Sequence, residues 1–129
     1  MNYEAAMAHD FNAGRAVSPH AMTAWHSAIA PYMSAATRIL DIGSGTGRFA
    51  VLLAQWFGAP VFGIEPANAM CKMACAGAVH RKVFYVYERA ESIPFLEKSF
   101  SAALLSNVCH HISDRVSCAA ELARVLHSE

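Results

Sequence analysis

The sequence has few charged residues and no excess of either sign. Ten basic and ten acidic residues cancel, and charged residues make up 16% of the 129 positions, whereas hydrophobic residues make up 55%. Because the basic residues are scattered rather than clustered, we expect no nucleic-acid partner held by phosphate contacts. The high apolar content excludes a disordered chain and, at this length, predicts a single compact domain.

Long hydrophobic runs and a basic N-terminal segment are also lacking. Every apolar stretch is far shorter than the roughly 20 residues that a membrane-spanning helix needs, so we expect no membrane association. The N-terminal segment carries Glu4, His9 and Asp10 in place of a secretory signal. The four cysteines are too few for a disulfide scaffold and match no usual zinc spacing. Together these features predict a cytoplasmic protein with free thiols and no metal site.

Short apolar runs alternate with helical segments along the chain. Buried strands are predicted at 38–42, 61–65, 83–87 and 102–107. Helices are predicted at 20–33, 48–57, 68–78 and 115–126, with Ser18 and Asp114 as caps of the first and last. Strands that alternate with helices in this way favour an α/β fold, a doubly wound, mostly parallel open sheet with helices on both faces.

Two finer expectations concern buried side chains. The aromatic residues Phe84, Tyr85 and Tyr87 of the third strand are interpreted as sheet core rather than as a cage for a substrate. The apolar face of the last helix is predicted to consist of Ala119, Leu122, Ala123 and Leu126.

A glycine-rich turn joins the first strand to the next helix, in the stretch Asp41-Ile42-Gly43-Ser44-Gly45-Thr46-Gly47. Glycines at such a junction let the backbone turn sharply and approach a ligand at the helix N-terminus. Glu65 ends the next strand, 18 positions after Gly47, where a carboxylate can bind the two hydroxyls of a ribose. Both features predict one cleft at the carboxyl edge of the sheet.

Two common phosphate-binding motifs do not match this turn. Arg48 stands where the dinucleotide fingerprint needs its third glycine, and the Gly-Lys-Ser/Thr of a Walker loop is missing. Asp41 also argues against a pyrophosphate, because like charges about 4 Å apart repel by about 4 kcal/mol at an effective dielectric constant of about 20. An acidic residue instead suits a positively charged ligand, such as an ammonium or a sulfonium.

These motifs resemble those of the class I S-adenosylmethionine-dependent methyltransferases. The stretch 39–47 is similar to the strand and glycine turn of the family's first motif. Similar stretches follow in order at 61–66, 90–95, 99–101, 110–112 and 121–126. The likeness covers 38–127, and these stretches are similar to the small-molecule branch that includes ubiquinone and menaquinone biosynthesis methyltransferases.

The resemblance implies a Rossmann-like methyltransferase fold, with S-adenosylmethionine as cofactor and a small-molecule methyl acceptor. Asp41 would lie near the cofactor's ammonium, the turn around its methionine part, and Glu65 at its ribose hydroxyls. Pro66, Ala90 and Glu91 would lie beside adenine, and Asn107 on the methionine side. The cofactor-binding residues implied are Asp41, Gly43, Ser44, Gly45, Thr46, Gly47, Glu65, Pro66, Ala90, Glu91 and Asn107.

The sequence departs from the family's pattern in three places. Arg89 stands where the family usually has an aspartate that accepts a hydrogen bond from adenine, and arginine has no acceptor. Ser101 also stands in place of the usual aspartate. After 124–126 the family continues through a Lys-Pro-Gly-Gly turn into three more strands, whereas this chain continues only with 127–129. The sheet is therefore expected to be C-terminally incomplete.

Two functions remain open at this point. The first is methyl transfer to a small metabolite, for which no base is obligatory. His110 and His111 are the candidates for a base, because histidine is the usual side chain for this role near neutral pH. The alternative is a truncated S-adenosylmethionine-binding or interaction module without turnover. Residues 1–37 are expected to form a helical lid segment on the core formed by 38–129. The fourth strand would lie at an exposed sheet edge, which favours a homo-oligomer.

Overall fold

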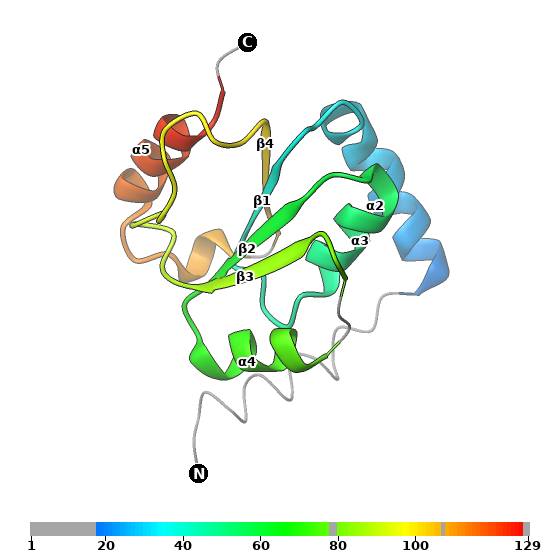
Figure 1. Cartoon of the computed structure of the whole chain (residues 1–129), viewed down its shortest axis with the longest axis horizontal. Coiled ribbons are helices and arrows are strands. Elements are labelled where there is room, and N and C mark those ends of the chain that lie inside the picture. The colour runs from blue at the N-terminus through cyan, green and yellow to red at the C-terminus, as the bar shows by residue number, and fades with distance from the viewer. Residues whose placement is uncertain (1–17, 78–79, 107, 128–129) are drawn as a thin grey trace.

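Four parallel strands form one sheet in the order β3–β2–β1–β4 in the computed structural model, which describes residues 18–77, 80–106 and 108–127 (Figure 1). The strands are β1 (Ile39–Ile42), β2 (Val61–Glu65), β3 (Val83–Tyr87) and β4 (Ala102–Leu105). The helices among the described residues are α2 (Pro19–Met33), α3 (Arg48–Phe57), α4 (Asn68–Ala76) and α5 (Arg115–Val125), with a short 3₁₀ helix η1 (Cys109–His111). The predicted doubly wound α/β sheet is confirmed.

The direction in which successive strands are added to the sheet reverses at β1. From β1 the chain adds β2 and β3 on one side and then returns to place β4 on the other side of β1. Ligands of open α/β sheets bind beyond the carboxyl ends of the strands at such a reversal. The topology therefore puts a crevice above β1, where the glycine turn lies.

The central strand β1 is buried on both faces. Ile39 packs with α2 and α3 in one hydrophobic cluster, whereas Leu40 and Ile42 pack with α5 and the loop after β3 in a second cluster. Figure 1 shows α2 and α3 on one side of the sheet and α5 on the other. Because both faces are covered, all four β1 residues are buried, which explains the nearly continuous apolar run.

Both predicted helix caps are present. Ser18 Oγ accepts a hydrogen bond from the Ala21 amide at 3.1 Å, and Pro19 follows as the first helical residue. Asp114 Oδ1 accepts from the Ser117 amide at 3.0 Å. These side chains satisfy amides that the first turn of a helix leaves without a backbone partner, so local chemistry sets where α2 and α5 begin.

The expected aromatic core of the third strand is wrong for two of its three members. Phe84 is 48% exposed and Tyr87 is 60% exposed, whereas Tyr85 is half-buried against the α3 cluster. The reason is position, because β3 is an edge strand of the sheet. Strand propensity does not reveal whether a strand lies at the centre or at the edge.

The buried face of α5 also differs from the prediction. Ala119 and Ala123 are exposed. Leu122 and Leu126 pack against the core as predicted, together with the buried Cys118 and Val125. The chain leaves the helix after Val125, so Leu126 forms a bridge with Phe100 instead of extending the helix. β4 ends at Leu105, two residues earlier than predicted.

The N-terminal helix shares the core of the sheet. Ile29 and Met33 of α2 belong to the same cluster as Ile39 and Leu53, so no separate core divides the chain at position 37. Residues 1–17 lie outside the described part, and the role of 1–37 as a lid stays a prediction. Among the described residues, no helix has the length and apolar character to cross a membrane.

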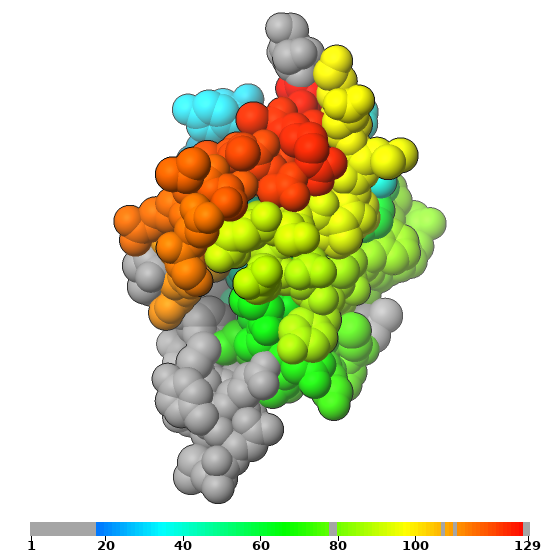
Figure 2. Space-filling model, turned by 90° about the vertical axis from the view of Figure 1, so that its left-hand side faces the viewer, coloured from blue at the N-terminus to red at the C-terminus, as the bar shows by residue number. Residues whose placement is uncertain are grey.

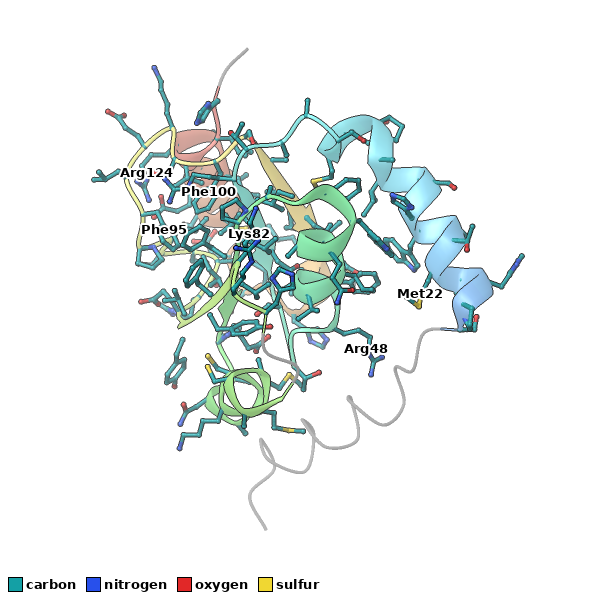
Figure 3. All side chains as sticks on the ribbon, turned by 45° about the vertical axis from the view of Figure 1, so that its right-hand side comes forward. Met22, Arg48, Lys82, Phe95, Phe100 and Arg124 are labelled. Atoms are coloured by element: carbon teal, nitrogen blue, oxygen red, sulfur yellow. The ribbon has the colours of Figure 1, made fainter. Side chains whose placement is uncertain are left out.

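Phe100 anchors the α5 side of the core and provides a test of the packing. It is fully buried, and its ring centroid lies 5.1 Å from that of Phe95 and 5.6 Å from that of Phe62 (Figure 3). We expect Phe100→Ala to lower the free energy of unfolding by about 3–5 kcal/mol, measured by urea denaturation. The matched variant Phe84→Ala removes a half-exposed ring and should cost only about 1 kcal/mol. Equal losses in the two variants would contradict this description of the core.

Candidate functional site

The glycine turn at 43–47 is tightly enclosed. Gly43, Gly45 and Gly47 have φ angles of 67°, 59° and 89°, which side chains rarely adopt. A Cβ atom on Gly43 would lie 2.2 Å from Val108 Cγ2, and one on Gly47 would lie 2.2 Å from Tyr85 Oη. Glycine is therefore required at both positions by backbone conformation and by space.

Hydrogen bonds hold the turn against the end of β2. The amides of Gly43 and Ser44 both donate to the Ile64 carbonyl oxygen, at 2.8 and 3.0 Å. The amide of Gly45 donates to Glu65 Oε1 at 2.8 Å. The turn is thus positioned by the strand that carries the predicted carboxylate.

Glu65 links the turn to the beginning of α4. Its side chain is only 5% exposed; Oε1 accepts from Gly45, and Oε2 accepts from the Ala67 amide at 2.8 Å. Bonds from two amides stabilise the charged form of a buried carboxylate. Glu65 therefore stands at the carboxyl edge of the sheet as a fixed, two-oxygen hydrogen-bond acceptor.

A cavity of about 100 Å³ lies beside the turn, at the reversal of the strand order. Five predicted site residues, from four separate segments, line it: Gly43, Pro66, Ala90, Glu91 and His111. Arg89, which stands at the family's adenine-binding position, also lines it. The other walls, to which the sequence assigned no role in the site, are Ile42, Ile64, Val108, Ile112 and Ser113. The apolar walls are strand ends and a loop, and only knowledge of the strand order could have placed them together.

Six other predicted residues lie next to the cavity but not in its wall. Asp41, Ser44, Gly45, Thr46, Gly47 and Glu65 form the turn and the strand ends that support it. Asn107 and the side chain of His110 lie outside the described residues. His111 is exposed and belongs to η1.

Asp41 is the most unusual titratable group of this region. It is 2% exposed, and its Oδ2 atom makes no hydrogen bond with the described residues. Burial and, to a smaller extent, the nearby charge of Glu65 raise the pKa of Asp41 from 3.8 to about 7. A positive charge near Asp41 would reverse this shift, because it stabilises the carboxylate.

An arginine on α5 holds the loop that forms one wall of the cavity. Arg124 donates to the carbonyl oxygens of Ile93 and Phe95, each at 2.7 Å, and pairs with Glu121, which in turn accepts from the Ile93 amide. Figure 2 shows this loop against α5, and Figure 3 shows Arg124 beside Phe95. The stretch 121–126 carried a sequence likeness, but its role as a clamp required the tertiary structure.

Comparison with known proteins identifies similar chains. Residues 40–129 match the family described as a methyltransferase domain. The chain is 35% identical over 97 residues to the O-methyltransferase resE of Aspergillus sclerotiorum, which covers 72% of this chain and 37% of that protein. It is 32% identical over 90 residues to the demethylmenaquinone methyltransferase of Roseiflexus castenholzii, which covers 68% of this chain and 37% of that protein.

Solved structures show the same fold. The crystal structure of the YcgJ protein from Bacillus subtilis superposes with a TM-score of 0.73 at 28% sequence identity, covering 86% of this chain and 47% of that one. The expected Rossmann-like methyltransferase fold is thus confirmed. The chain spans less than half the length of each of these three relatives.

The raised pKa of Asp41 predicts an unusual dependence of stability on pH. Between pH 4 and 7 the folded protein keeps a proton that the unfolded chain releases, so the free energy of unfolding should fall as the pH rises through this interval. Asp41→Asn removes this loss. In urea denaturation, the free energy of unfolding of the variant minus that of the parent should be larger at pH 8 than at pH 4, by up to about 4 kcal/mol.

Asp114→Asn is the matched control. Hydrogen bonds from Ser117 lower the pKa of Asp114, so its contribution is present above the unfolded pKa and is lost as the pH falls. The contribution of Asp114 to the free energy of unfolding should therefore fall as the pH decreases, whereas that of Asp41 falls as the pH rises. If the stability of Asp41→Asn ran parallel to that of the parent from pH 4 to 8, the electrostatic description of Asp41 would be wrong.

Proposed function

This chain belongs to the methyltransferase domain family, and we propose that it binds S-adenosylmethionine at the glycine turn and transfers the methyl group to a small-molecule acceptor. The observation that carries the proposal is the convergence of the glycine turn, the residues after β2 and the residues after β3 on one cavity. These segments are far apart in the sequence. Each contains residues that the family resemblance assigns to the cofactor.

The volume and the apolar lining of the cavity suit the adenine ring of the cofactor. Pockets for whole ligands usually measure about 300–1,000 Å³, whereas this cavity measures about 100 Å³ and has mostly apolar walls. We therefore assign adenine to the cavity, with Pro66, Ala90 and Glu91 as its walls. The ribose and the methionine part would lie outside the cavity, along the turn.

The polar residues fit the remaining parts of the cofactor. The Glu65 carboxylate is an acceptor for the two ribose hydroxyls. The buried Asp41 carboxylate favours a cationic group nearby, because a positive charge would stabilise its charged form. S-adenosylmethionine carries both an ammonium and a sulfonium, which matches this preference and opposes a phosphate ligand.

In this mechanism the protein mainly positions the reactants. When bound, S-adenosylmethionine supplies the electrophilic methyl carbon of its sulfonium, which an acceptor atom attacks in line. The turn and Glu65 would orient the cofactor, and the apolar walls would exclude water. We propose His111, at the rim of the cavity, as the candidate to take a proton from the acceptor; His110 stays a second candidate.

A second candidate function is a cofactor-binding module without turnover. The chain spans 37% of the length of the two curated relatives described above, so the activity of those whole proteins stays a proposal for this chain. Methyl transfer to any member of a metabolite panel would exclude this candidate. Binding of the cofactor without transfer would support it.

The sheet edge suggests self-association. Within 18–77, 80–106 and 108–127, β4 is the last strand of the sheet on its side, and its sequence Ala-Ala-Leu-Leu contains no charge or proline to discourage pairing. We propose that two copies pair through β4, and we expect a dimer or larger species in sedimentation velocity. Amide exchange of β4 should slow as the concentration rises, whereas that of the central β1 should not change. A monomer at all concentrations would contradict the proposal.

Cofactor binding is tested by calorimetric titration with S-adenosylmethionine and S-adenosylhomocysteine. Glu65→Gln should weaken binding of both by about 10- to 100-fold, because it removes a charged acceptor for the hydroxyls and for the Gly45 amide. The control Glu97→Gln changes an exposed residue outside the site and should bind like the parent. Failure of the parent to bind either compound would overturn both candidate functions.

A further inference from the structure

A row of three residues crosses the sheet beneath the glycine turn. Asp41 of β1 is in register with Gly63 of β2, and Gly63 is in register with Tyr85 of β3. Residues in register share a face of the sheet. The side chains of Asp41 and Tyr85 therefore lie on the face that α3 covers, with no side chain between them.

The missing side chain of Gly63 makes room for two others. A Cβ atom on Gly63 would lie 2.7 Å from Ser44 Oγ and 3.0 Å from Tyr85 Cδ1. The Tyr85 ring extends from there to the turn, where its hydroxyl oxygen would lie 2.2 Å from a Cβ on Gly47. The Ser44 side chain thus extends from the turn toward Gly63 of the sheet, and the Tyr85 hydroxyl extends from the sheet to the turn at Gly47.

Three buried oxygen atoms in this space have no hydrogen-bond partner among the described residues. They are Asp41 Oδ2, Ser44 Oγ and Tyr85 Oη. Unsatisfied buried polar atoms are costly and rare in folded proteins. A buried water molecule typically bonds to about three such groups, and one carboxylate with two hydroxyls supplies both acceptors and donors. None of the three residues lines the cavity, so the adenine assigned to the cavity does not reach these oxygen atoms.

We propose that Asp41, Ser44 and Tyr85 bind one ordered water molecule beneath the glycine turn, and that Tyr85 is thereby a positioning residue for the turn. Ile64 and Glu65 hold the turn from the side of β2. The water would hold it from below, connecting Ser44 in the turn to β1 and β3. The effect on cofactor affinity rests on the proposed function, whereas the water site itself does not.

The charges around this site allow a specific readout. The titratable groups that act on Asp41 and Tyr85 are Glu65 at the end of β2 and Cys71 and Cys75 on α4. Burial, and then the charge of Asp41, raise the pKa of Tyr85 to about 12. Tyr85 therefore stays protonated between pH 5 and 8, the range in which Asp41 titrates.

The test compares Tyr85→Phe with Tyr32→Phe. The first variant keeps the ring that fills the space under the turn and removes only the hydroxyl, and the second removes a hydroxyl from a residue that is 80% exposed on α2. Calorimetric affinity for S-adenosylhomocysteine should fall about tenfold in Tyr85→Phe and stay unchanged in Tyr32→Phe. Ser44→Ala should reproduce the loss if Tyr85→Phe folds poorly.

A second measurement needs no ligand. A bridging water stabilises the Asp41 carboxylate, so Tyr85→Phe should move the midpoint of the pH-dependent change in unfolding free energy upward by about half a pH unit. Tyr32→Phe should not move it. An unchanged midpoint would overturn the water site, whatever the affinity, and a shifted midpoint with unchanged affinity would overturn the positioning role. If the parent binds no S-adenosylhomocysteine, the proposed function fails, but the midpoint still tests the water site.

Discussion

The buried carboxylate of Glu65 is the interaction on which the site depends. Its two oxygens accept from the amides of Gly45 and Ala67, which belong to the turn after β1 and to the segment before α4. One side chain thus fixes two chain segments at the same edge of the sheet. Because the carboxylate is almost fully buried, its charge must be stabilised by hydrogen bonds from these amides. The turn therefore has little freedom to adopt another conformation.

The opposite wall of the cavity is held by an arginine rather than by a carboxylate. Ala90 and Glu91 lie in a long loop, and the loop gains its position from Arg124 on α5, which binds the carbonyl oxygens of Ile93 and Phe95. A guanidinium can donate to several acceptors at once. The cavity therefore lies between a turn held by a carboxylate and a loop held by a guanidinium, and the α5 side of the core supports both.

Features with local causes could be predicted from the sequence. The caps Ser18 and Asp114 act within one helical turn, and the glycine turn follows from backbone conformations that glycine adopts easily. Features that depend on neighbours were missed or misassigned. Phe84 is exposed because β3 is an edge strand, and the roles of Tyr85 and Arg124 arise from residues far away in the chain.

The sequence by itself determined the alternation of strands and helices, the position of the glycine turn and the acidic residue that follows it by 18 positions. These depend on hydrophobic periodicity and on contacts between near neighbours. Only the tertiary structure decided that β3 lies at an edge of the sheet and that Asp41, Gly63 and Tyr85 form one row. Strand order and register are set by the packing of the whole sheet, and no short segment of the chain contains that information.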